Sequence, residues 1–288
     1  MKELFPDIVL PISTRPGVDV CVAAGASPNE LLWLTAPKRA AHDRVFPPDA
    51  AVYLHSFRAG PEITTRPYKP RRRPHFIQRI GADVLFVAGR QRDRRPNGWL
   101  LDGAGRVVRR VPLGDGLSDV RVSPAGKIWT AYFDEGVYGA GDGAEGVVAR
   151  DGLGRRVWGF DPNRAGTDVI DDVYAFNLAA EDDAWVYFYM PFALVRWRKN
   201  KPTVWQTRVE GARAIAVRGT EALLLGDYDD PTVLRILDLP KGGGRARVKR
   251  RLRLRLPEGT DVRWLVALGA AHRLALWSNR DLMILDRW

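Results

Sequence analysis

Hydrophobic and polar positions alternate along most of the chain, and this alternation predicts short β-strands joined into hairpins. The clearest hairpin covers residues 119–134. Val120 and Val122 alternate with polar residues, a Pro-Ala-Gly turn follows, and a β-rich run extends from Ile128 to Phe133. Period-two alternation interrupted by turn residues is typical of antiparallel strands. Almost no segment has the 3.6-residue period of a helix, so an all-β fold is predicted.

The same hairpin recurs along the chain. Seven residues separate Val122 from Trp129 in its two strands, and the separation recurs in Leu178–Trp185, Val217–Leu224 and Leu268–Ala275. A third hydrophobic run and a fourth, more polar run follow the hairpins, so each unit predicts a four-stranded meander. The first strands are expected near Val18, His75, Leu117, Val173, Ala212 and Val262. These six units repeat at the spacing of propeller blades.

The last unit ends at Trp288 after only three strands. The segment Asp7–Ile12, before the first full unit, is hydrophobic and β-branched and can supply the missing outer strand. Pairing of the two ends would remove an exposed sheet edge. We therefore predict a single domain over residues 1–288, a six-bladed β-propeller whose last blade is closed by the N-terminal strand. A β-sandwich is the alternative, but it leaves the recurring spacing unexplained.

The run Val120–Trp129 resembles the inner hairpin of bacterial six-bladed propellers of the NHL and SMP-30/gluconolactonase-like group. That resemblance implies a propeller, but the group includes calcium-dependent hydrolases as well as binding scaffolds, so it assigns no single activity. Its lactonase-like members carry Glu, Asn and Asp metal ligands at the tops of inner strands. Here Asn177 aligns with Arg121 and Ala216, which argues against a lactonase.

Carboxylates concentrate in the loops that a meander places on one face, which we call the top face. The acidic candidates are Asp119, Asp134, Glu135, Asp171, Asp172, Asp229 and Asp230, with Tyr132, Tyr174 and Tyr189 expected beside them. A divalent cation, calcium or manganese, is one expected occupant, with Asp119, Asp134, Asp171 and Asp229 as ligands. Crowded carboxylates also suit acid–base catalysis, for which the candidates are Asp134, Glu135, Asp171, Asp172 and His75. Rings and carboxylates together suit a polar or cationic ligand. The structural alternative is that Asp simply populates exposed turns.

The excess of positive charge is confined to two segments of a chain whose net charge is +11. The first, residues 66–95, includes Arg71, Arg72, Arg73 and Arg90, which are expected on the top face opposite the acidic loops, where they could hold an anionic group. The second, residues 241–255, includes alternating Arg and Leu from Arg251 to Leu256 on an expected outer strand. Protection of the sheet edge is one interpretation of this strand, and a patch for nucleic acid is the other.

Several classes of protein are excluded or disfavoured. One cysteine and four histidines without ligand spacing exclude an intramolecular disulfide and a structural zinc site. No P-loop, Gly-x-Ser-x-Gly elbow or dinucleotide fingerprint is present. The N-terminus has no signal-peptide pattern, and the longest uncharged apolar run, Ala184–Val195, is too short to span a membrane. A cytoplasmic monomer is expected.

Three functional hypotheses follow. The first is a scaffold that binds a small polar ligand or a protein partner at the mouth of its top face. The second is a calcium- or manganese-assisted hydrolase or lyase that uses the top-face carboxylates. The third is a basic-patch protein that binds a polyanion such as nucleic acid, with salt-sensitive affinity.

Overall fold

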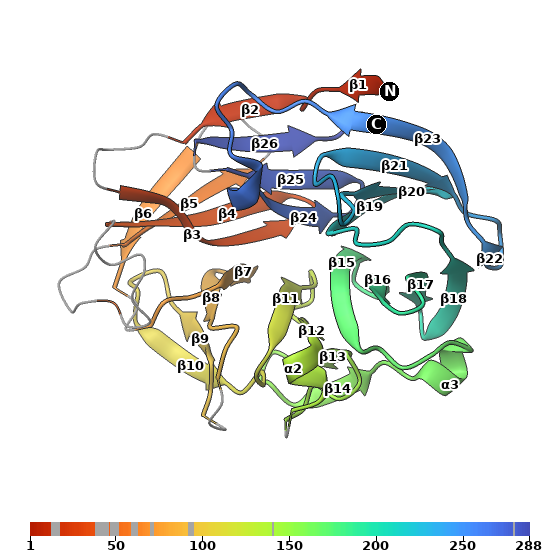
Figure 1. Ribbon diagram of the computed structural model, residues 1–288. Helices are drawn as coiled ribbons and strands as arrows, with labels where there is room; N and C mark the ends of the chain where they lie inside the picture. The colour runs from red at the N-terminus through yellow and green to blue at the C-terminus, as the bar shows by residue number, and fades with distance from the viewer. Residues whose placement is uncertain are drawn as a thin grey trace.

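The computed structural model describes residues 1–12, 18–37, 46, 52–58, 63–69, 72–91, 95–139, 141–278 and 280–288. The described residues form an all-β propeller, as predicted, built from antiparallel meanders around a common centre (Figure 1). Helices in the described part of the chain are single turns: α2 (Asp134–Val137), α3 (Pro162–Ala165) and the 3-10 turn η1 (Val262–Trp264). No helix among the described residues is long and apolar enough to cross a membrane.

The first eight strands of the meanders form one sheet. Its first meander is β3 (Val18–Ser27), β4 (Glu30–Pro37), β5 (Val52–Arg58) and β6 (Ile63–Tyr68). Its second is β7 (Phe76–Ile80), β8 (Asp83–Val87), β9 (Gly98–Leu101) and β10 (Val107–Val111). A bridge between Ala24 and Phe76 joins the inner strands β3 and β7.

Separate sheets contain the other meanders. The third is β11 (Leu117–Val122), β12 (Ile128–Tyr132), β13 (Val147–Arg150) and β14 (Arg156–Gly159). The next is β15 (Asp172–Ala180), β16 (Asp183–Tyr189), β17 (Ala193–Arg198) and β18 (Lys201–Gln206), to which β22 (Gly244–Arg245) is added. It is followed by β19 (Ala214–Arg218), β20 (Glu221–Leu225), β21 (Val233–Asp238) and β23 (Arg247–Leu254). The final strands of the chain are β24 (Val266–Ala270), β25 (Arg273–Trp277) and β26 (Asp281–Leu285).

Two details of the predicted repeat were wrong. The first strand of the last meander starts at Val266 rather than near Val262. The Asp261 side chain accepts a hydrogen bond from the Arg263 backbone and caps η1, so residues 262–264 form a turn instead of a strand. The seven-residue separation marks a directly opposed pair in Leu268–Ala275 but not in Val122–Trp129, where Trp129 faces Arg121. Turn lengths differ between the hairpins, so a constant spacing does not define a constant register.

The hydrophobic core lies between neighbouring meanders. Each of its clusters joins two consecutive meanders, as Trp129 and Val186 do between the sheets of β12 and β16. Another cluster joins the end of the chain to its beginning through Trp277 and Trp33. Because every meander is covered on both faces, its inner strands read as nearly continuous hydrophobic runs.

Polar side chains connect the inner strands at the centre of the propeller. Asn177 donates hydrogen bonds to the carbonyl oxygens of Ile215 (2.9 Å) and Ala271 (2.8 Å), and accepts one from the Ala271 N–H. Gln78 similarly donates to the carbonyl of Val120 at 3.0 Å. Each bond links strands of different meanders, so the centre is held by directional contacts in addition to hydrophobic ones.

Glycine is required where inner strands approach most closely. A Cβ on Gly25 would lie 1.7 Å from the carbonyl oxygen of Ile77, and one on Gly269 would lie 1.8 Å from that of Ile215. No side chain fits at such distances, so these two strands can pack against their neighbours only with glycine at these positions.

An ion pair is buried in the same region. Arg121 is 2% exposed and donates to the carboxylate of Asp119 at 2.8 Å and to the carbonyl of Ala26 at 2.9 Å. Burial raises the pKa of Asp119, and the neighbouring guanidinium of Arg121 offsets this only in part. Neither charge can be removed alone without leaving the other uncompensated.

Replacement of Arg121 by Met should lower the free energy of unfolding by about 3–5 kcal/mol, because the Asp119 carboxylate would stay buried without its partner. The double variant Asp119→Asn/Arg121→Met should recover part of that loss. Urea unfolding followed by circular dichroism measures both effects. Equal stability of the single and double variants would contradict the interpretation.

The N-terminal segment contributes strands to two sheets. Strand β2 (Ile8–Pro11) pairs antiparallel with β26, so the expected pairing of Asp7–Ile12 beside the last strand is present. Strand β1 (Lys2–Leu4) pairs parallel with β23, where Lys2 faces Leu252. The outer edge formed by residues 252–254 of β23 is therefore covered by backbone pairing, which the sequence did not predict.

Asp7 joins the two ends of the chain. Its carboxylate accepts hydrogen bonds from the backbone of Asp286 (2.6 Å) and Arg287 (2.8 Å) and pairs with the Arg287 guanidinium at 2.6 Å. Although burial acts to raise the pKa of Asp7, these donors lower it overall. The ionised carboxylate therefore stabilises the fold above its unfolded-state pKa, near 3.9, and this contribution is lost as the pH falls through the lower folded-state pKa.

Asp7→Ala should reduce the free energy of unfolding by about 2 kcal/mol at pH 7, the value typical of hydrogen bonds to a charged group. The difference from the parent chain should narrow below about pH 3 as the carboxyl is protonated. Thermal unfolding at both pH values measures it. Glu258→Ala, which removes an exposed carboxylate, is the matched control and should change little.

Candidate functional site

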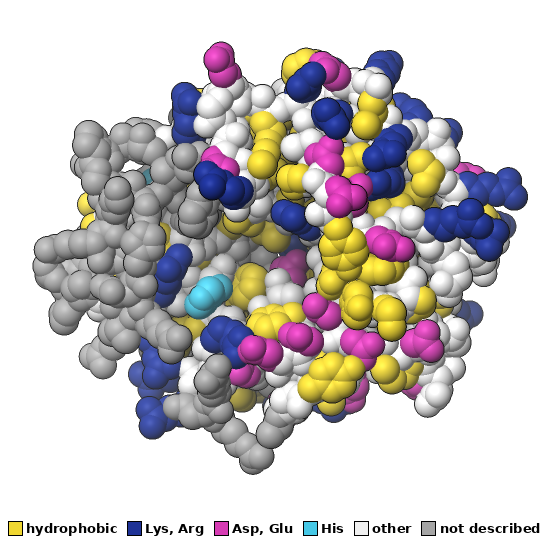
Figure 2. Space-filling model, in the orientation of Figure 1, with side chains coloured by type: hydrophobic (Ala, Val, Ile, Leu, Met, Phe, Trp, Pro, Cys, Tyr) yellow, Lys and Arg dark blue, Asp and Glu magenta, His cyan; other side chains and the backbone are white. Residues whose placement is uncertain are grey.

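The top face carries α2 and the loops that precede the inner strands β11 and β15. Acidic and hydrophobic side chains gather there around a hollow at the centre of the molecule (Figure 2). The sequence predicts α2 poorly, because it is a single turn between β12 and β13. Its first two residues, Asp134 and Glu135, are exposed, and the Asp134 carboxylate accepts a hydrogen bond from the Glu135 backbone N–H.

Asp172 is the carboxylate at this mouth whose chemistry is most perturbed. It begins β15, is half-buried, and has no hydrogen-bond donor among the described residues. Burial raises its pKa to about 6, and the negative charge of the nearby Asp134 adds to the effect. Near neutral pH, Asp172 therefore carries a charge that the described part of the protein leaves unneutralised.

The neighbouring carboxylates have partners of their own. Asp171 accepts a hydrogen bond from the hydroxyl of Tyr138, which is exposed just after α2. Glu135 pairs with Arg90 across the mouth. The structure thus brings Asp134, Asp171 and Asp172 onto the same part of the top face but leaves only Asp172 half-buried and unpaired among them. Sequence reasoning missed Tyr138, because nothing in the local pattern predicts its contact with Asp171.

An aromatic cluster lies directly beside Asp172. Tyr189 is opposite Asp172 in the β15–β16 pairing, and its ring stacks on Tyr174 with centroids 5.8 Å apart and planes at 20°. The hydroxyls of Tyr174 and Tyr228 are 3.1 Å apart, and Phe192 contacts all three rings. Tyr189 is 38% and Tyr228 is 55% exposed. The predicted residues Tyr174 and Tyr189 therefore do come together, with an accessible aromatic surface next to a carboxylate.

The basic residues expected opposite the acidic loops are only partly free. Arg90 donates to Asp115 at 3.2 Å, pairs with Glu135 and lies 5.3 Å from the centre of the Phe133 ring. Arg72 donates to the side chain of Gln91 at 2.6 Å. Arg90 is therefore neutralised by the acidic side of the mouth rather than held apart from it as expected. Arg71 lies outside the described residues.

His75 and Arg73 lie together before β7. The Nδ1 atom of His75 accepts a hydrogen bond from the Gly89 backbone at 3.1 Å, which leaves its other ring nitrogen as the remaining polar group. Burial and the adjacent Arg73 charge lower the pKa of His75, so it is neutral at pH 7. Arg73 makes no side-chain hydrogen bond to any described residue, and its buried Nε has no acceptor.

Three of the predicted residues, Asp119, Tyr132 and Asp230, are engaged in contacts outside the mouth. Asp119 is in the buried ion pair with Arg121. Tyr132 is fully buried and donates to the carbonyl of Leu113 at 2.6 Å, so its ring contacts core residues and not the mouth. Asp230 accepts hydrogen bonds from Thr232 and pairs with Arg253 of the outer strand β23. Asp229 is exposed in the same tight loop, after Asp227.

The expected metal ligands do not converge. Within the described part of the chain, no group of three or more His, Cys, Asp or Glu side chains is arranged to hold a metal ion. Asp119, Asp134, Asp171 and Asp229 in particular are separated between the buried centre, α2, the loop before β15 and the β20–β21 loop. The physical reason is that residues equivalent in the repeat occupy different depths and point toward different partners.

Comparison with known proteins supports the fold alone. No protein-family model and no curated protein sequence matches the chain. The structure is similar to a chain in the crystal structure of the mitotic checkpoint complex, with a TM-score of 0.57 and 9% identity, covering 100% of this chain and 93% of that one. It is also similar to the Cps50 (Swd1) β-propeller domain of Myceliophteria thermophila, with a TM-score of 0.51 and 13% identity over 97% of this chain and 89% of that one. A chain of a nidogen/laminin complex has a TM-score of 0.52 at 11% identity, covering 84% and 82% of the respective chains.

Asp172→Asn should raise the free energy of unfolding at pH 7.5 by about 1 kcal/mol. Because folding raises the pKa of Asp172 to about 6, the free energy of unfolding falls as the pH rises from the unfolded-state pKa to about 6. The amide of the Asp172→Asn variant does not ionise, so the variant avoids that loss. The gain is below the full linkage value because water screens a half-exposed group. Thermal melts at pH 4 and pH 7.5 measure it, and a gain that is equal at both pH values would contradict this account.

Proposed function

We propose that this protein is a six-bladed β-propeller scaffold that binds a cationic group at the mouth of its top face. The blade count is supported by the four-stranded meanders that begin with β3, β7, β11, β15 and β19, together with a last one completed by β2. Contacts between consecutive inner strands, including β24 with β3, support a closed ring.

One observation carries the functional proposal: the half-buried carboxylate of Asp172, unpaired among the described residues, lies opposite the exposed Tyr189, whose ring stacks on the partly buried Tyr174. A carboxylate supplies the counter-charge for an ammonium or guanidinium group, and ring faces attract the same cation through their quadrupoles. The cation can belong to a small polar ligand or to a Lys or Arg side chain of a protein partner.

A hydrolase or lyase is the second candidate. The observation in its favour is the pKa of Asp172, because a carboxyl with a pKa of about 6 suits a general acid. Assistance by calcium or manganese is less well supported, since the described carboxylates do not converge as ligands. The scaffold therefore explains more of the top face than the enzyme does.

Binding of tetramethylammonium and agmatine, measured by ligand-observed NMR, tests the proposal. Asp172→Asn should weaken binding about tenfold, because the counter-charge is lost, and Tyr189→Leu about fivefold, because a ring face is lost. Affinity should also fall between pH 7.5 and pH 5 as Asp172 is protonated.

Asp168→Asn is the matched control, because it removes an exposed carboxylate four residues before Asp172. It should leave binding unchanged. Absence of binding by both probes at pH 7.5, or an equal loss in Asp168→Asn and Asp172→Asn, would reject the proposal.

A further inference from the structure

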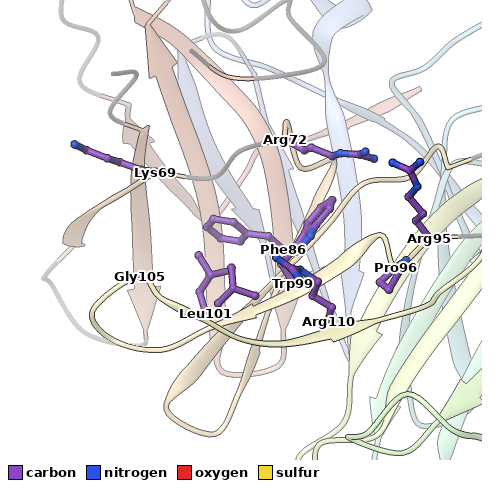
Figure 3. A pocket seen from close by; sticks show the side chains of 10 residues that line it. Lys69, Arg72, Phe86, Arg95, Pro96, Trp99, Leu101, Gly105 and Arg110 are labelled. Atoms are coloured by element: carbon purple, nitrogen blue, oxygen red, sulfur yellow. The ribbon is translucent and has the colours of Figure 1, made fainter. Parts of the chain in front are cut away.

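A second cavity lies on the side of the propeller, between the first two meanders. It has a volume of about 760 Å³ and is lined by Lys69, Arg72, Arg95 and Arg110 around a floor that includes Phe86 and Trp99 (Figure 3). The carboxylates of the top-face mouth do not contribute to it. We call it the basic groove.

The register of the second meander explains how hydrophobic and basic residues share this groove. Trp99 is opposite Phe86 in the β8–β9 pairing and opposite Arg110 in the β9–β10 pairing, so the three side chains project from the same face of the sheet. Arg109, the preceding residue on β10, projects from the other face and donates to the carbonyl of Gly152 at 2.6 Å. The groove face is the one that turns toward the first meander, where Phe86 contacts Tyr68.

Two of the cations in the groove have no counter-charge among the residues that the structure describes. No acidic side chain is among the described residues that line it. Arg110 and Lys69 form no ion pair or side-chain hydrogen bond with any described residue, and Arg72 bonds to a neutral amide, that of Gln91. By contrast, Arg58 and Arg79 of the adjoining sheet region are paired with Glu30. Cations that share a groove repel each other, so an anion bound near Lys69 and Arg110 would remove an unfavourable electrostatic interaction.

The geometry points to one class of ligand. Figure 3 shows the guanidinium ends of Arg72 and Arg95 directed toward one another, and the same pocket is lined by Phe86 and Trp99. Guanidinium groups bind phosphate oxygens with matched geometry, and a partly exposed indole offers a face for a planar ring. The volume falls within the range of small-ligand pockets, about 300–1,000 Å³.

We propose that the basic groove binds nucleotides: a planar base against Trp99 with its phosphates held by Arg72, Arg95 and Arg110. The base and phosphate can belong to a free nucleotide or to a single-stranded nucleic acid. The site is independent of the cation site at the top-face mouth.

Isothermal titration with ADP and with a single-stranded oligoadenylate tests the proposal and distinguishes the two sources. Arg110→Gln and Arg72→Gln should each weaken binding about tenfold, because each removes one charge-assisted contact. Pyrophosphate and adenosine, which carry only one half of the ligand, should each bind at least about tenfold more weakly than ADP. Affinity should fall when NaCl is raised from about 50 to about 200 mM.

Arg109→Gln is the matched control, with the same change of charge at the preceding position of β10 but on the opposite face. It should change the affinity less than about twofold. Contact of the base with the protein is tested on the parent chain, because a Trp99→Leu variant would also remove a contact with the core. Saturation-transfer NMR should show the adenine protons of ADP in contact with the protein. Asp172→Asn should leave ADP binding unchanged.

Tighter binding of oligoadenylate than of ADP, with the same loss in Arg110→Gln, would identify nucleic acid as the source, and the reverse order would identify the free nucleotide. The proposal is overturned if neither probe binds, if Arg109→Gln weakens binding as much as Arg110→Gln, or if pyrophosphate binds as tightly as ADP.

Discussion

The close approach of the inner strands at the centre is the constraint on which the rest of the structure depends. Gly25 and Gly269 permit contact with the carbonyls of neighbouring strands, and Asn177 then connects three strands through its single amide. The outer strands pair in order onto these inner strands, so the inner strands set their positions. A side chain at Gly269 would push its strand away from Ile215 and Asn177, and one at Gly25 would push its strand away from Ile77.

This tight centre also decides which charged residues can take part in chemistry. Asp119 and Arg121 are on an inner strand at the level where the strands meet, so they neutralise one another and are buried. Asp172 begins an inner strand one level higher, where the mouth is open and water still reaches the carboxylate. The same residue type therefore has a structural role at one depth and a raised pKa with no described partner at another.

Acidic and basic side chains are concentrated at two separate places in the structure, and not on opposite sides of the top-face mouth as the sequence predicted. Arg90, which the sequence places opposite the acidic loops, is paired with Asp115 and Glu135, so the top face has an acidic and aromatic character near Asp172. Four cationic side chains lie instead between the first two meanders, around Trp99. The two proposed sites therefore differ in ligand charge as well as in location, which makes simultaneous occupancy compatible with the geometry.

The sequence by itself determined the all-β class, the meander repeat and the pairing of Asp7–Ile12 with the last strand, because alternation, turn residues and an incomplete last unit are local signals. It also placed Asp172, Tyr174 and Tyr189 together on the top face, and the structure pairs Asp172 with Tyr189 across one hairpin. Only the tertiary structure decided that Tyr132 is buried, that Asp230 pairs with Arg253, and that the basic residues around Trp99 share a groove. How deeply a side chain is buried and which residue it pairs with depend on contacts between segments far apart in the sequence. A local sequence pattern does not encode the distance between such segments.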